Sequence, residues 1–272
     1  MQTMSYFYQV TDHRVITPDG NLFVRQRKAS GVAADAPVIL LYHDSLGSVA
    51  LWRDFPEQLA EATGLSVIAY DRLGFGQSDP NPQTLKPSFM MDEAQVSVAA
   101  IKEQLSIGKF IAFGHSVGGA MAVASAAHFP GDCVAVITES AQALVEDITI
   151  HGIRDAEVNF ADPVQIARLE RYHGDKTRWV LDAWINTWTA DIFADWTMDS
   201  MLTEVRCPLL AIHGDKDEFG SPAHPERIAG KSGGPSAQMH MMQDTGHVPH
   251  RERPEAVLAL VITFLCENGL IG

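Results

Sequence analysis

The stretch Gly114-His115-Ser116-Val117-Gly118-Gly119 decides the fold of this chain. A short apolar run, Phe110–Phe113, precedes it, and a run of small residues, Ala120–Ala127, follows it. This order predicts a buried strand, a sharp turn and a helix. The turn requires small neighbours around its serine, because side chains at Gly114 and Gly118 would collide across it. We therefore expect a serine raised above the edge of a buried sheet.

Ser116 at this turn is predicted to be a nucleophile, with its hydroxyl lifted above the sheet. The backbone N–H of Val117, at the start of the helix, would then point toward a developing oxyanion. A second donor is expected from the loop His43-Asp44-Ser45-Leu46-Gly47-Ser48, which follows another apolar run. From its position in that loop, we assign this role to the backbone N–H of Ser45.

A serine hydroxyl at its ordinary pKa is a poor nucleophile, so this prediction requires a base and an acid that orients the base. His247, before the last predicted helix, is the candidate general base, and Asp217, in a loop after a strand, is the candidate acid. Asp215 is an alternative acid, and Glu139 is a more distant one. His250 is interpreted as a residue that caps the final helix or faces solvent.

Five short and nearly continuous apolar runs predict strands that are buried on both faces of a parallel sheet. They are Val38–Tyr42, Leu65–Ala69, Phe110–Phe113, Cys133–Ile137 and Leu209–Ile212. Helical segments alternate with them, and the turn cluster Pro18–Asn21 predicts an antiparallel hairpin ahead of them. The sequence therefore predicts an α/β fold with a mostly parallel sheet that is entered through an antiparallel hairpin.

Residues 141–203 break this alternation, because their pattern is helical without a convincing strand. We interpret them as a helical cap insertion, and residues 1–140 and 204–272 as the core domain. Three tryptophans of the insertion, Trp179, Trp184 and Trp188, are candidates to line a substrate pocket. Packing of one helical face on the core is an equally good interpretation of these rings.

Composition excludes several classes of partner. Of the 272 residues, 46% are hydrophobic, and the formal net charge of −14 opposes binding to nucleic acid or to an anionic membrane. The three cysteines are widely spaced and predict neither a disulfide framework nor a metal site. The first eight residues lack a signal-peptide pattern, and the longest apolar run, Ala256–Leu265, is shorter than the ~20 residues that span a bilayer. We expect a cytoplasmic protein.

Taken together, the motifs resemble those of the α/β-hydrolase superfamily over nearly the whole chain. Four segments carry the resemblance in the expected order: His43–Ser48 with Trp52, Asp71–Ser78, Gly114–Gly119, and Gly214–Asp217 with Gly246-His247. The resemblance implies a Ser-Asp-His mechanism without a cofactor. The stretch Ser45–Ser48 with Leu51-Trp52 is similar to the corresponding loop of 3-oxoadipate enol-lactonases and their relatives.

The resemblance sets expectations for function. It implies hydrolysis of a small-molecule carboxylic ester or lactone through an acyl-enzyme. A C–C bond or thioester hydrolase with the same three residues is the alternative, and a small-molecule sensor on this scaffold is a further one. Asp44 stands where many members have glycine, and its charge near the pocket mouth argues against anionic substrates.

Overall fold

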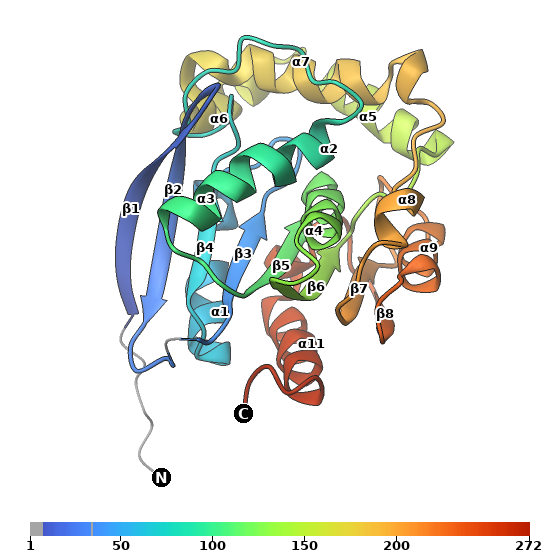
Figure 1. Ribbon diagram of the computed structural model, residues 1–272. Coiled ribbons are helices and arrows are strands. Elements are labelled where there is room, and N and C mark those ends of the chain that lie inside the picture. The colour runs from blue at the N-terminus through green and yellow to red at the C-terminus, as the bar shows by residue number, and fades with distance from the viewer. Residues whose placement is uncertain (1–7, 34) are drawn as a thin grey trace.

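The core of the protein is an eight-stranded sheet, seen in a computed structural model that describes residues 8–33 and 35–272. Its strand order is β1-β2-β4-β3-β5-β6-β7-β8 (Figure 1). The strands are β1 Tyr8–Thr17, β2 Gly20–Ala29, β3 Val38–Tyr42, β4 Val67–Tyr70, β5 Phe110–His115, β6 Cys133–Glu139, β7 Leu209–Gly214 and β8 Ala237–Met242. The β1–β2 hairpin and the β2–β4 pair are antiparallel, whereas every other pair is parallel. The predicted fold class is confirmed.

Helices cover both faces of the sheet. They are α1 Phe55–Thr63, α2 Phe89–Asp92, α3 Ala99–Gln104, α4 Val117–His128, α5 Asp147–Asn159, α6 Pro163–His173, α7 Thr177–Trp188, α8 Asp199–Leu202, α9 Ala223–Lys231, α10 Pro249–Glu252 and α11 Pro254–Glu267. Alternate residues of a strand serve the two faces: in β3, Leu40 packs with the cluster that contains α4, and Leu41 packs with the cluster that contains α1 and α11. The central strands are therefore buried on both sides, which explains their continuous apolar sequences.

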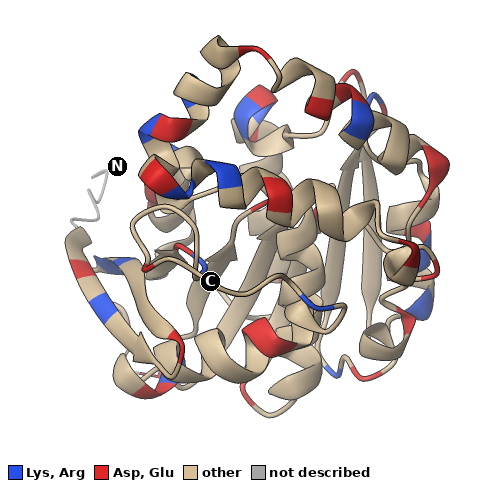
Figure 2. Cartoon of the chain, turned by 90° about the horizontal axis from the view of Figure 1, so that it is seen from above, with Lys and Arg blue, Asp and Glu red and all other residues tan. Residues whose placement is uncertain are grey.

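The segment between β6 and β7 holds helices α5 to α8, and α5, α6 and α7 lie across the top of the sheet (Figure 1). This is the carboxyl end of the parallel strands. An isolated antiparallel bridge between Leu144 and Thr197 joins the two ends of the segment. Seen from above, acidic and basic residues are interspersed along the helices (Figure 2).

Local details differ from the sequence prediction in two places. Apolar residues spaced by three and four predict one regular helix after a capping Ser88, namely Met91, Ala94, Val98, Ile101 and Leu105. The structure instead has α2, a π-helical segment at Glu93–Val98 and then α3. Ser88 does not cap the backbone of α2, because its hydroxyl donates to the Asp92 carboxylate instead.

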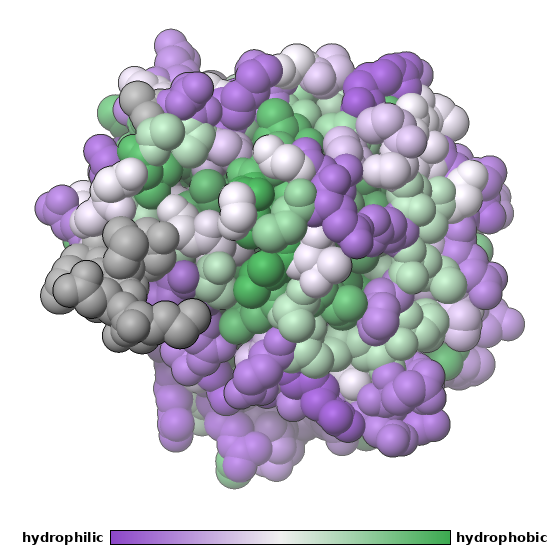
Figure 3. All heavy atoms as spheres, turned by 90° about the horizontal axis from the view of Figure 1, so that it is seen from below, coloured by the Kyte–Doolittle hydropathy of each residue, from purple (hydrophilic) through white to green (hydrophobic). Residues whose placement is uncertain are grey.

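The expectation about a signal peptide concerns residues that, apart from Tyr8, lie outside the described part of the chain. No helix among the described residues is long and apolar enough to cross a membrane. Viewed from below, the protein shows hydrophobic residues near the centre and hydrophilic residues around the margin (Figure 3).

Candidate active site

Ser116 occupies the turn between β5 and α4 in a strained backbone conformation, with φ 56° and ψ −127°. Two glycines make this turn possible. A Cβ at Gly114 would lie 2.0 Å from the carbonyl oxygen of Gly118, and a Cβ at Gly118 would lie 2.1 Å from the carbonyl oxygen of Tyr42. The predicted collision across the turn is therefore correct for Gly114, whereas Gly118 is required by the close approach of β3.

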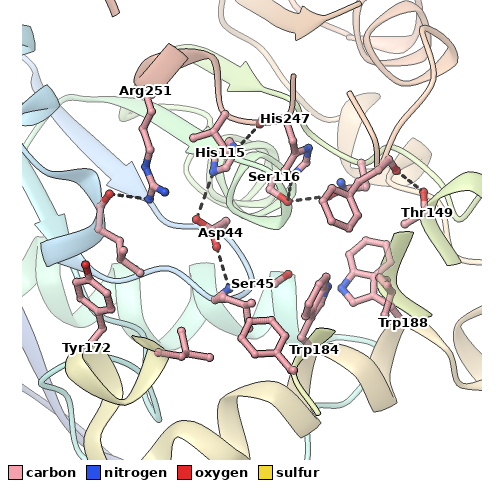
Figure 4. A pocket seen from close by; sticks show the side chains of 18 of the residues that line it. Asp44, Ser45, His115, Ser116, Thr149, Tyr172, Trp184, Trp188, His247 and Arg251 are labelled. Atoms are coloured by element: carbon pink, nitrogen blue, oxygen red, sulfur yellow. Dashed lines mark hydrogen bonds and ion pairs between the residues drawn. The ribbon is translucent and has the colours of Figure 1, made fainter. Parts of the chain in front are cut away.

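Ser116 lies within hydrogen-bond distance of His247. The Nε2 atom of His247 lies 3.1 Å from the Ser116 hydroxyl, and its Nδ1 atom lies 2.8 and 2.9 Å from the two carboxylate oxygens of Asp217. Asp217 follows β7, and His247 lies between β8 and α10. The carboxyl ends of parallel strands thus bring together three residues that are far apart in the sequence, and Figure 4 shows two of them, Ser116 and His247, side by side. The hydroxyl can also donate to the amide oxygen of Gln142, at 3.2 Å.

The structure separates the alternative acids. Asp217 contacts His247, whereas Asp215 accepts a hydrogen bond from the backbone N–H of Thr245. Burial acts to raise the pKa of Asp217, but the hydrogen bond and charge of His247, helped by His213, outweigh burial and hold this pKa below its ordinary value. Asp217 is therefore an ionised acceptor that can fix the tautomer of His247 with a proton on Nδ1.

His250 is neither a helix cap nor a solvent-facing residue, so its interpretation from the sequence is wrong. It is 3% exposed, and both its backbone N–H and its Nδ1 lie 2.6 Å from the carboxylate oxygens of Glu139, which is completely buried. A buried carboxylate needs hydrogen-bond partners, and His250 supplies them. These hydrogen bonds pair the Glu139 carboxylate with His250, and the acid that contacts His247 is Asp217.

His115 links this buried region to the candidate site. Its Nε2 lies 2.8 Å from the carbonyl oxygen of His247, and its Nδ1 lies 3.4 Å from the Asp44 carboxylate. Burial acts to lower the pKa of His115, but Asp44 and Glu139 outweigh burial and raise it. The same contact holds the pKa of Asp44 far below its ordinary value, against the effect of burial. His115 and Asp44 thus form an ion pair under the loop that carries His247.

The two backbone donors predicted for an oxyanion come from separate elements. Val117 is the first residue of α4, and Ser45 lies in the loop after β3. Within the described ranges, no hydrogen-bond acceptor faces the backbone N–H of either residue. The N–H of Val117 has no acceptor within α4 because it lies in the first turn of the helix. An unpaired backbone N–H near Ser116 can donate a hydrogen bond to a negatively charged oxygen of a substrate.

Ser116 and His247 open onto a cavity of about 300 Å³ whose walls are largely apolar. Trp184 and Trp188, both from α7, line this cavity (Figure 4). Trp179 does not line it, contrary to its selection as a pocket candidate, because its ring packs against Gly74 and Phe75.

Other side chains, which were not predicted from the sequence, also line the cavity. They are Gln142, Thr149, Ile153, Phe160, Gln165, Arg168, Leu169, Tyr172, Phe219, Val248 and Arg251. Val248 and Arg251 follow His247 by one and four positions, and this proximity is the one sequence signal that could have singled out members of the set. Within residues 8–33 and 35–272, no group of three or more His, Cys, Asp or Glu side chains is arranged to hold a metal ion.

Comparison with known proteins places this geometry in a family. A model described as the alpha/beta hydrolase fold matches residues 37–183. The chain is 25% identical to a proline iminopeptidase of Heyndrickxia coagulans, over 84% of this chain and 90% of that protein. It is 26% identical to the human serine hydrolase BPHL, over 84% of this chain and 78% of that protein.

The solved structures agree in fold. The crystal structure of the proline iminopeptidase of Mycobacterium smegmatis is similar, with a TM-score of 0.72 and 21% identity, over 96% of this chain and 99% of that one. Together with the mostly parallel sheet and the matched family model, these likenesses identify the chain as a hydrolase that belongs to the alpha/beta hydrolase fold family.

Proposed function

We propose that this protein hydrolyses a small carboxylic ester or lactone through an acyl-enzyme. The observation that carries the proposal is the chain of hydrogen bonds from the Ser116 hydroxyl through His247 to Asp217, at the wall of an apolar cavity. A hydroxyl, an imidazole and a buried carboxylate in this order are the parts that serine nucleophiles require.

Each residue has a defined part in the proposed reaction. As the Oγ of Ser116 bonds to the carbonyl carbon, its proton passes to Nε2 of His247, and Asp217 stabilises the resulting imidazolium. The backbone N–H groups of Ser45 and Val117 donate hydrogen bonds to the negatively charged carbonyl oxygen. His247 then gives its proton to the leaving alkoxide as the C–O bond breaks. Water attacks the acyl-enzyme with His247 again acting as base, and Ser116 is released.

The cavity favours an ester or lactone over a peptide with a free amino terminus. The relatives include proteins named proline iminopeptidase, and a substrate with a protonated amine would need an acidic partner. Asp44 is the one carboxylate among the described residues that line the cavity, and it is engaged with His115. Arg168 and Arg251 line the same cavity and would repel an ammonium group.

The test is hydrolysis of p-nitrophenyl acetate and p-nitrophenyl butyrate by the wild type and by Ser116→Ala. We expect the variant to lose roughly a thousandfold or more of kcat. A fluorophosphonate should label Ser116 in the wild type, as mapped by peptide mass. Ser125→Ala is the matched control, because Ser125 lies on α4 outside the cavity lining, and its rates and labelling should be unchanged.

The outcomes separate the rival functions. Equal ester rates in wild type and Ser116→Ala would refute the proposal. Trace ester rates beside rapid cleavage of an acyl-thioester or a vinylogous diketone would favour thioester or C–C bond hydrolysis. Slow single turnover with a ligand-induced rise in Tm would favour a sensor.

A further inference from the structure

The charges that line the cavity differ in sign from the protein as a whole. The chain has a formal net charge of −14, yet the cavity lining contains two arginines, Arg168 and Arg251, against a single carboxylate, Asp44. Asp44 was expected from the sequence to disfavour anionic substrates, but in the structure it is paired first with His115 and interacts with Arg251 only through a smaller, longer-range charge effect. Its Oδ2 lies 3.4 Å from His115, and its Oδ1 accepts a hydrogen bond from the backbone N–H of Leu46.

Arg251 is fixed in place without a carboxylate partner. It extends from α10, and its guanidinium donates to the carbonyl oxygen of Leu51 at 2.7 Å. Its Nε is buried and has no acceptor among the described residues, and no described carboxylate lies within 4.0 Å of its guanidinium. A guanidinium held this way at a cavity wall has donors left for a ligand and little rotational entropy to lose on binding.

Arg168, which is exposed, adds a second positive charge to the cavity lining. It lies on α6, and its one side-chain hydrogen bond within the described ranges goes to the neutral Gln165 amide, at 3.2 Å. Figure 4 shows Arg251 and the Trp184–Trp188 pair on opposite sides of Ser116. The cavity therefore has an apolar end at the tryptophans and a cationic end at Arg251.

We propose that the substrate carries a carboxylate, which Arg251 binds with support from Arg168 while the reacting carbonyl sits at Ser116. This inference rests on the proposed function and narrows it to monoanionic esters or lactones. The physical basis is a charge-assisted hydrogen bond between guanidinium and carboxylate in a partly desolvated cavity. Such a bond is worth roughly a tenfold to hundredfold preference over a neutral substrate of the same shape.

The first experiment compares two matched pairs of esters. One pair places the carboxylate on the acyl side: mono-p-nitrophenyl glutarate against p-nitrophenyl pentanoate, with the uncatalysed rate of the glutarate subtracted. The other pair places it on the alcohol side: 4-carboxyphenyl butyrate against phenyl butyrate. In at least one of the two pairs, the kcat/KM of wild type should be about tenfold or more higher for the anionic ester than for the neutral one.

The preference should depend on Arg251 and less strongly on Arg168. Arg251→Gln should abolish the ratio between anionic and neutral ester, Arg251→Lys should retain part of it, and Arg168→Gln should reduce it. Arg171→Gln is the matched control, because Arg171 is exposed on the same helix as Arg168 and does not line the cavity. The inference is overturned if wild type shows no preference for the anionic ester in either pair. It is also overturned if Arg251→Gln lowers kcat/KM equally for the anionic and the neutral ester of a pair.

A binding measurement keeps this inference separate from the proposed function. Trp184 and Trp188 report binding by fluorescence in Ser116→Ala, with monomethyl glutarate compared with methyl pentanoate as probes. Tighter binding of the anion that is lost in Ser116→Ala/Arg251→Gln supports the anion site even if wild type hydrolyses no ester. Equal binding of both probes refutes the site even if neutral esters are hydrolysed rapidly.

Discussion

Replacing Asp217 with asparagine should reverse the hydrogen bond that this residue makes with His247. The backbone N–H of Phe219 donates to Oδ1 of Asp217 at 2.8 Å, so this position must remain an oxygen. The amide NH₂ of an asparagine is thereby placed at Oδ2, which lies 2.9 Å from Nδ1 of His247. The amide oxygen at Oδ1 stays 2.8 Å from the same Nδ1, so the two amide groups compete for it. Where the NH₂ donates to Nδ1, the imidazole proton moves to Nε2, and His247 in that tautomer can no longer accept the proton of Ser116.

The expected cost follows from this change of tautomer. We expect Asp217→Asn to lose roughly 10³ to 10⁴ in kcat with little change in KM, because the substrate cavity is untouched. That loss corresponds to about 4 to 5.5 kcal/mol of transition-state stabilisation. The assay is p-nitrophenyl butyrate hydrolysis over a range of substrate concentrations, with thermal unfolding as a check that the isosteric variant folds.

Asp215→Asn is the control for this prediction, since Asp215 has the same side chain two residues away. Its Oδ1 accepts from Thr245, a bond that an amide oxygen also makes, so we expect activity within about threefold of wild type. Retention of more than a tenth of wild-type kcat by Asp217→Asn, or an equal loss in Asp215→Asn, would refute the reasoning.

Three further predictions concern the turn, the buried acid and the tryptophans. Gly118→Ala places a Cβ 2.1 Å from a backbone oxygen of β3 and should lower the free energy of unfolding, measured in urea, by about 3 kcal/mol. Gly131→Ala is the control, because a Cβ there meets nothing within 4 Å and should change this free energy little. Equal losses in the two variants would contradict this account. Burial raises the pKa of Glu139, but its imidazole partners outweigh burial and hold it below the ordinary value. The carboxylate therefore stabilises the fold above the usual pKa of about 4.3, and this stability is lost as pH falls through the folded value. In Glu139→Gln, Tm should accordingly fall less steeply with decreasing pH below about pH 5 than in wild type. An unchanged slope of Tm against pH would contradict this role of Glu139. Trp184→Ala should lower kcat/KM for butyrate relative to acetate esters by about tenfold, while Trp179→Ala should leave that ratio unchanged; parallel effects would argue against the cavity as the acyl site.

Local sequence was sufficient for the elements of the core. The alternation of apolar runs with helical segments, the turn after Thr17 and the small residues around Ser116 depend on neighbours in the chain, and each was predicted from them. The order of serine, acid and histidine also indicated which loops meet at the carboxyl ends of the strands. The π-helical segment at Glu93–Val98 was not predicted, because its spacing of apolar residues also fits a regular helix.

Tertiary structure alone decided which polar groups meet. The sequence favoured Asp217 over Asp215 only by its position farther from the strand end, and the path of the loop after β7 decides the choice by turning Asp217 toward His247. Glu139 and His250 are 111 positions apart and form a buried pair, and Arg251 reaches the cavity wall through the same short helix. Helix and strand formation follow from nearby residues, but a hydrogen bond between distant side chains depends on distances of a few tenths of an ångström that the packing of the whole sheet sets.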